Sequence, residues 1–203
     1  MINMNSINRI HNVSFQSKIR LVNKSEFNKF VSSYEKQHFV DFPWTVQESV
    51  ISDKAYTRGV SDCTVCGIND GLKVLMFHIS PTIRENDDFR KIRGLIKRTF
   101  DLKDKNLQGF IFGSKNIKGM LPQSKINFEK FEKILKNIGI PYSKIKSGPY
   151  TNDLAYSSKT DEWVVSFNML EDESVKEDFK EPVKFLDRYF DEVEINPLDE
   201  LSW

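Results

Sequence analysis

The sequence predicts an α+β fold, and three observations predict it. Short apolar runs of β-type residues meet at turn residues, several longer segments carry an apolar stripe at helical spacing, and the two kinds of element alternate unevenly, which disfavours a purely parallel sheet. Of the 203 residues, 39% are hydrophobic, 29% charged and 12% aromatic, which is typical of a globular domain with a sizeable core.

Three segments in the first 141 residues are predicted to be helices. The first runs from a cap at Ser25 to about residue 37. The second begins among acidic residues and ends at Lys97 and Arg98, as the helix dipole favours. The third follows a cap at Asn127 and is stopped by Gly139 and Pro141. Each of the three would bury one apolar face.

Strands are predicted on both sides of Asn69-Asp70-Gly71, because Asp-Gly is a strong signal for a tight hairpin. Further strands are predicted at 107–114, 141–148, 153–158 and 162–167. With the hairpin turn centred on 69–71, the numbers of facing residues add up to about 140. His78 would then face residue 62 and lie beside Cys63.

The two ends of the chain differ in character from its middle. Residues 1–18 are rich in Asn and Ser and predict a loose terminus, and 174–193 predict an amphipathic helix that breaks or restarts at Pro182. Residues 171–203 carry a net charge of −8, which leaves +9 on 1–170. We therefore divide the chain into an N-terminal extension with one helix (1–45), a central domain (46–170) and an acidic C-terminal helix (171–203).

Composition also narrows the class of protein. The net charge of +1 gives no global field toward nucleic acid or a membrane, and two cysteines do not make a disulfide scaffold. The first residues lack the apolar core of a signal peptide, and no run approaches the roughly 18 apolar residues of a membrane span. We expect a cytoplasmic protein with no membrane insertion and no nucleic-acid partner; export as an effector by a specialised secretion system stays open.

Both cysteines and one of the three histidines fall between residues 56 and 82, and three interpretations compete there. Cys63 and Cys66 form a C-x-x-C, but in an extended segment residues three apart point to opposite faces, which opposes a disulfide or shared metal. Both cysteines are also compatible with plain buried apolar residues, with His78 ending a strand.

The third interpretation is nucleophilic catalysis. A thiol attacks as the thiolate, so it needs an imidazole to take its proton and a third group to orient that imidazole. A hairpin can bring Cys63 and His78 together, and the hydroxyl of Thr57, six residues before Cys63, can meet the far ring nitrogen. The spacing is compatible with this arrangement, and all three interpretations remain open on these residues alone.

The order of several residues resembles the motif of a known family, the bacterial chemoreceptor glutamine deamidases called CheD. The matching residues are Thr57, Gly59, Cys63, the turn Asp70-Gly71, His78 and Pro81. The resemblance continues through 107–117, which is similar to a family strand ending in Phe-Gly-Gly, and through 126–141, similar to a capped helix ending in Ile-Pro. Residues 142–167 resemble its last strands, so 56–167 are covered in consistent order.

This resemblance implies a layered fold, related to bacterial toxin deamidases, with mixed sheets packed face to face and helices outside. It implies Cys63 as the nucleophile, His78 as the general base and then acid, and Thr57 as the residue that orients His78. Oxyanion or loop candidates are Gly59, Ser61 and Asp62, with the backbone N–H of Cys63 as a donor. The substrate would be an exposed glutamine of a protein, a chemoreceptor or host protein, with a regulatory protein as a further partner and no cofactor or metal.

The chain departs from the family pattern at several positions. Ser61-Asp62 replaces a Gly-Ser before the cysteine, Ser114 replaces a second glycine, and Thr151-Asn152-Asp153 stands where an Arg is usual. A carboxylate at Asp62 raises the thiol pKa unless a cation such as Arg58 meets it. Two alternatives to deamidation therefore stand: a cysteine protease or transglutaminase-like acyl transfer, and a catalytically inactive binding module of the same fold.

Overall fold

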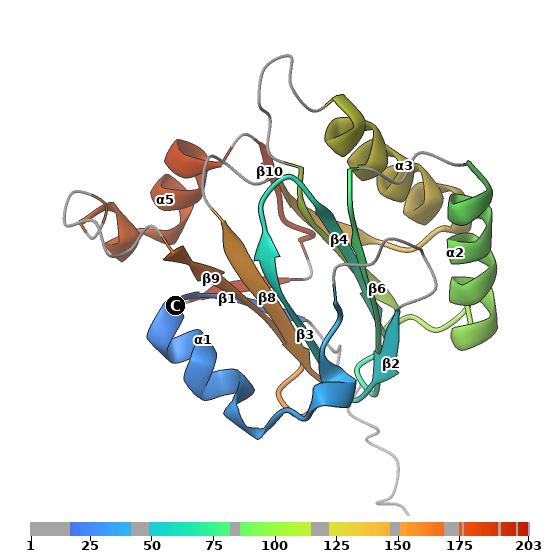
Figure 1. Ribbon diagram of the computed structural model, residues 1–203, viewed down its shortest axis with the longest axis horizontal. Helices are drawn as coiled ribbons and strands as arrows, with labels where there is room; N and C mark the ends of the chain where they lie inside the picture. The colour runs from blue at the N-terminus through green and yellow to red at the C-terminus, as the bar shows by residue number, and fades with distance from the viewer. Residues whose placement is uncertain are drawn as a thin grey trace, which may run out of the picture.

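The computed structural model describes residues 17–41, 49–81, 86–114, 122–146, 151–168, 175, 177–190, 192–197 and 199–202. Its strands form two mixed sheets that pack face to face, with helices on the outside (Figure 1). The predicted α+β class is therefore confirmed, and so is the packing of sheet on sheet.

Sheet A has the strand order β11-β1-β9-β8-β3, made of β1 (Lys18–Asn23), β3 (Lys54–Val60), β8 (Asn152–Ser157), β9 (Glu162–Phe167) and β11 (Glu200–Ser202). Sheet B has the order β10-β7-β6-β4-β5-β2, made of β2 (Val50–Ser52), β4 (Thr64–Asn69), β5 (Val74–Ile79), β6 (Gln108–Gly113), β7 (Tyr142–Lys146) and β10 (Glu192–Glu194). The helices are α1 (Lys24–Phe30), α2 (Asn86–Thr99), α3 (Pro122–Ile138) and α5 (Pro182–Tyr189).

Three apolar clusters hold these layers together, and strand alternation assigns residues to them. On β4 and β5, Val65 and Met76 face the inter-sheet core, while Cys66 and Phe77 face α2 and α3. A smaller cluster around Phe27 packs α1 on the outer face of sheet A. All residues of β4, β5 and β6 are buried, because these strands are covered on both faces.

The β4–β5 hairpin has a different register from the predicted one. His78 faces Val65, not residue 62, and the strands are joined by the loop 70–73. The carboxylate of Asp70 accepts hydrogen bonds from the N–H groups of Leu72 and Lys73, at 3.0 and 2.9 Å. This side-chain cap supports a longer loop than the two-residue Asp-Gly turn, and it moves the pairing by three residues.

The ends of the chain contribute to both sheets. Residues 18–23, expected to end or follow a loose terminus, form β1, which lies parallel between β9 and β11. The predicted C-terminal helix is shorter: Asp178–Lys180 forms a 3-10 turn, and α5 starts with Pro182 at its first turn, so the helix restarts there. Residues 192–194 are strand β10, paired with β7, where the prediction placed helix.

Two predicted helix starts are also wrong. Asn23, not Ser25, caps α1, with a reciprocal pair of hydrogen bonds to Glu26, and the helix ends at Phe30. The helix α3 begins at Pro122, so Asn127 lies inside it. The side chain of Asn127 instead donates to the carbonyl of Ser80 at 3.1 Å, a tertiary contact that a capping pattern cannot reveal.

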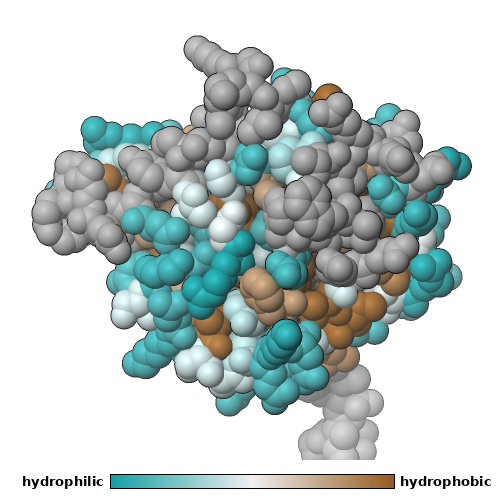
Figure 2. Space-filling view, in the orientation of Figure 1, coloured by the Kyte–Doolittle hydropathy of each residue, from teal (hydrophilic) through white to brown (hydrophobic). Residues whose placement is uncertain are grey.

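The surface seen in Figure 2 is mostly hydrophilic, with a hydrophobic area in the region of β2, where Ile51 is 49% exposed. Among the described helices, none has the length and apolar character needed to span a bilayer.

Replacement of Gly67 by alanine is expected to destabilise the fold. A Cβ atom at Gly67 would lie 2.0 Å from Cη2 of Trp163, a buried ring of the facing sheet. We expect Gly67→Ala to lower the free energy of unfolding by about 1–3 kcal/mol or more, measured by urea denaturation. The control Gly94→Ala meets only the end of the Arg98 side chain at 3.3 Å within α2, and it should stabilise by about 0.5–1 kcal/mol. Equal effects of the two changes would contradict this view of the core.

Candidate functional site

A hydrogen-bonded chain connects the two sheets at His78. Thr57 on β3 and His78 on β5 both face the space between the sheets, and Oγ1 of Thr57 lies 2.6 Å from Nδ1 of His78. The Thr57 hydroxyl also donates to the carbonyl of Val40 at 2.7 Å. Val40 is fixed in turn, because its N–H donates to the carbonyl of Tyr56 at 2.8 Å.

This chain fixes the tautomer of the imidazole. A threonine hydroxyl can donate one hydrogen bond, and here it donates to the carbonyl of Val40. The contact between Oγ1 and Nδ1 therefore needs the proton of the ring, so Nδ1 carries hydrogen and Nε2 carries the lone pair. This is the tautomer that a general base requires when it takes a proton through Nε2.

Cys63 lies one residue before β4, in the bend 61–63. Because side chains alternate along a strand, Cys66 falls on the side of β4 opposite to Val65, the residue that His78 faces. Cys63 precedes the paired residues of the hairpin, and among the described residues no hydrogen bond joins its Sγ to the ring of His78. Cys63 is 2% exposed, and its Sγ lies 3.9 Å from Oδ1 of Asp62.

The backbone of Cys63 is held from two sides. Its carbonyl accepts a hydrogen bond from the N–H of Ser114 at 2.8 Å, and a Cβ atom on Gly113 would lie 2.2 Å from that carbonyl oxygen. Gly113 has φ +117° and Ser114 has φ +66°, both in the region that favours glycine. Only a residue without a side chain fits at 113, so this corner of β6 fixes the position of Cys63.

The first turns of α3 brace the two strand ends that carry Cys63 and His78. The hydroxyl of Ser124 donates to the carbonyl of Asp62, and Asn127 donates to the carbonyl of Ser80. Both side chains are buried. Sequence reasoning missed this role; Ser124 stands before a predicted helix with no pattern that marks it.

The bend after Thr57 depends on a buried carboxylate. The pairing of β3 with β8 is irregular between Thr57 and Val60, where Gly59 has φ +72°. Asp153 accepts from the N–H of Gly59 at 3.0 Å and forms ion pairs with Lys24 at 2.6 Å and Arg58 at 3.5 Å. Arg58 is therefore engaged by Asp153 and does not neutralise Asp62.

Burial sets the charge state of the two candidate reactive groups. Burial, and then repulsion by Asp62, raises the pKa of the Cys63 thiol to about 12. Burial lowers the pKa of His78 to about 4, opposed by the charges of Asp41 and Asp62. At neutral pH the site holds a thiol and a neutral imidazole.

The structure thus joins Thr57 and His78 directly, and Cys63 lies just before β4, the strand that pairs with β5, with Asp62 beside it. Ser61 and Asp62 are part of the bend before the cysteine, and Gly59 lies in the bulge of β3. The carbonyl of Val40, the charge of Asp41 and the braces from α3 come from segments with no recognisable motif. Among the described residues, no group of His, Cys, Asp and Glu side chains is placed to hold a metal ion.

No protein-family model and no curated protein matches the chain. The geometry of the site is therefore the basis for the functional proposal.

The tautomer of His78 can be measured by long-range ¹H–¹⁵N NMR. Because the pKa of His78 is lowered to about 4, we expect a neutral ring at pH 7 with a protonated Nδ1 and an unprotonated Nε2. Thr57→Val removes the acceptor and should abolish this preference, whereas Thr57→Ser should keep it. A ring protonated at Nε2 in the wild type would contradict the assignment.

The effect of Asp62 on the thiol can be measured by alkylation with iodoacetamide across pH, in a Cys66→Ala background. Asp62→Asn removes the repulsion that helps to raise the pKa of Cys63, so the rate should rise at pH 8, by roughly tenfold for each pKa unit recovered. Asp62→Glu keeps the charge and serves as the control. The same pH profile in all three proteins would show that Asp62 does not control the thiol.

Proposed function

We propose that this protein is a cysteine-dependent hydrolase that converts the side-chain amide of a protein glutamine to glutamate. The observation that carries the proposal is the hydrogen-bonded chain from Val40 through Thr57 to His78. It leaves Nε2 of the imidazole as a proton acceptor on β5, the strand that pairs with β4, and Cys63 directly precedes β4.

The chemistry follows from these groups. Nε2 of His78 takes the proton of the Cys63 thiol as Sγ attacks the carboxamide carbon, and a tetrahedral oxyanion forms. The C–N bond then breaks, and the proton on Nε2 leaves with the nitrogen as ammonia. Water, deprotonated by His78, attacks the thioester and releases glutamate and the free thiol. The oxyanion would be bound by backbone N–H groups of the bend 61–63, and such donors contribute about 3 kcal/mol.

The resemblance to the CheD family supports glutamine as the substrate. The family's second glycine corresponds to Ser114, which has a φ of +66°, a conformation that favours glycine. Of the motif residues, Thr57 lies on β3 and His78 on β5, and Cys63 directly precedes β4. Peptide-bond hydrolysis would use the same three groups on a backbone amide, and acyl transfer would pass the acyl group to an amine in place of water.

One observation favours a second candidate, a binding module without turnover. Cys63 is buried beside an ionised carboxylate, and its pKa is raised to about 12, which opposes thiolate formation. If this state persists when a partner binds, the fold serves recognition alone.

The deciding experiment is the loss of activity in Cys63→Ala. A mass-spectrometric search for glutamine residues that gain about 1 Da, as replacement of NH₂ by OH requires, should find sites with the wild type and none with Cys63→Ala. Ammonia release should stop with it. Turnover that survives in Cys63→Ala would end the proposal.

Cys66→Ala is the matched control, because Cys66 lies on the other face of β4, against the helices. It should retain activity, and an equal loss in both variants would favour a redox role for the pair. Added hydroxylamine separates hydrolysis from acyl transfer: a deamidase gives glutamate as the main product, and a transglutaminase-like enzyme gives the hydroxamate.

A further inference from the structure

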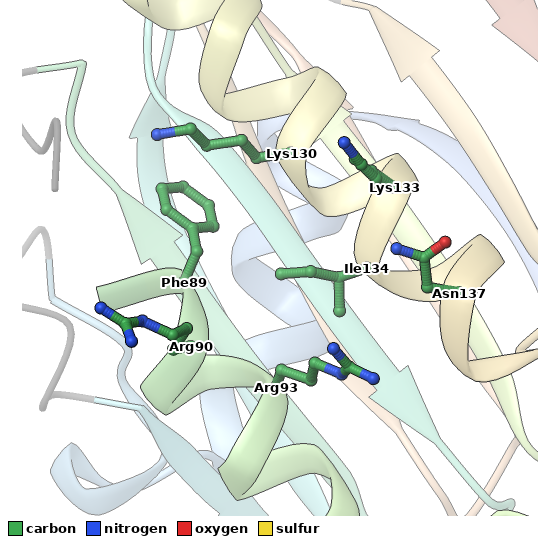
Figure 3. A pocket seen from close by; sticks show the side chains of 7 residues that line it. All are labelled: Phe89, Arg90, Arg93, Lys130, Lys133, Ile134 and Asn137. Carbon is green, nitrogen blue, oxygen red and sulfur yellow. The ribbon is translucent and has the colours of Figure 1, made fainter. Parts of the chain in front are cut away.

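A cationic groove lies between α2 and α3 on the outer side of sheet B. Figure 3 shows Arg90 and Arg93 on α2 and Lys130 and Lys133 on α3, with Phe89 and Ile134 between them. The groove holds about 290 Å³, and Asn137 completes its lining. The apolar floor is almost covered, since Phe89 is 6% and Ile134 8% exposed.

The described carboxylates of α2 and α3 form ion pairs with cations other than Arg93 and Lys133. Among the described side chains, Asp88 pairs with Lys91, Glu129 with Lys125, and Glu132 with Lys144. Among the described residues, Arg93 of α2 and Lys133 of α3 form no ion pair. The positive charges of Arg93 and Lys133 are thus not neutralised within the described part of the chain.

The cationic surface is larger than one small anion needs. The lining of α3 extends from Lys130 to Asn137, about 10 Å at the helical rise per residue. On α2 it continues into a second hollow, lined by Arg90, Lys91, Gly94 and Arg98. Several cations spaced along two helices suit a segment with several anionic groups.

We propose that this groove binds an acidic, amphipathic polypeptide segment of a partner protein. Its carboxylates would meet Arg93 and Lys133, and its apolar side chains would lie over Ile134, as in other helix-in-groove contacts. Binding of a single-stranded nucleic acid by base stacking is disfavoured because Nζ of Lys130 lies 4.6 Å from the centre of the Phe89 ring, which keeps that face from stacking on a base. The inference is independent of the proposed hydrolysis, because it concerns binding without turnover.

The test uses the full chain and a fluorescein-labelled peptide of about sixteen residues, rich in Glu with Leu at helical spacing. Arg93→Glu/Lys133→Glu should weaken binding by about tenfold or more, measured by fluorescence anisotropy, and added salt should weaken wild-type binding. The control Lys103→Glu/Lys105→Glu makes the same change of charge on exposed lysines of the loop after α2 and should bind within about twofold of wild type. Arg93→Ala/Lys133→Ala, which adds no acid, covers a failure of the first variant to fold.

Two outcomes would overturn the proposal. Equal loss in the groove variant and the control would mean that net charge, and not the groove, attracts the peptide. Single-stranded DNA of the same charge that binds as tightly as the peptide, and loses affinity in Arg93→Ala/Lys133→Ala, would assign the groove to nucleic acid. A version of the peptide with Gln in place of Glu should not bind.

Discussion

The candidate site depends on the direction of one hydrogen bond, the one that the hydroxyl of Thr57 donates. The hydroxyl of Thr57 donates its hydrogen bond to the carbonyl of Val40, so its oxygen can only accept a hydrogen bond from His78. The position of the Val40 carbonyl, which lies outside both sheets, therefore fixes which ring nitrogen of His78 is basic. Carboxylates orient histidines in many hydrolases, but a carboxylate here would also stabilise the imidazolium; a neutral hydroxyl orients the ring without that effect.

The Cys63 sulfur is also uncharged at neutral pH, because the pKa of its thiol is raised. With the pKa of the Cys63 thiol raised to about 12 and the pKa of His78 lowered to about 4, the two groups do not form a preformed thiolate–imidazolium ion pair. Asp62 acts on both groups: it opposes charge on the sulfur and favours charge on the ring. In the proposed reaction, proton transfer would be coupled to attack on the substrate, because negative charge would then move from the sulfur to the oxyanion and away from the carboxylate.

Local patterns predicted the parts of the fold that are decided locally. The hairpin around Asp70, the strands β6 to β9 and the apolar faces of α2 and α3 follow from turn chemistry and periodicity. The register of the β4–β5 hairpin could not be predicted in this way, because it depends on the Asp70 carboxylate, which caps two N–H groups of the loop. The strand β1 was missed because its neighbours β9 and β11 lie at the other end of the chain. Pairing of Thr57 with His78 could be proposed from residue types, whereas Val40 and the braces Ser124 and Asn127 are tertiary contacts without a sequence pattern.

A site divided between two sheets is only as well defined as the distance between them. One row of residues on the inner face of β4 sets that distance: Asn69 accepts from the indole N–H of Trp163 at 3.3 Å, and Gly67 leaves room for the same ring. Asn69 also donates to the hydroxyl of Tyr156 at 3.1 Å. Cys63 lies just before β4, so the strand that follows the nucleophile candidate is fixed to sheet A at its far end. The 2.6 Å contact of Thr57 with His78 is therefore a consequence of core packing as much as of the two residues themselves.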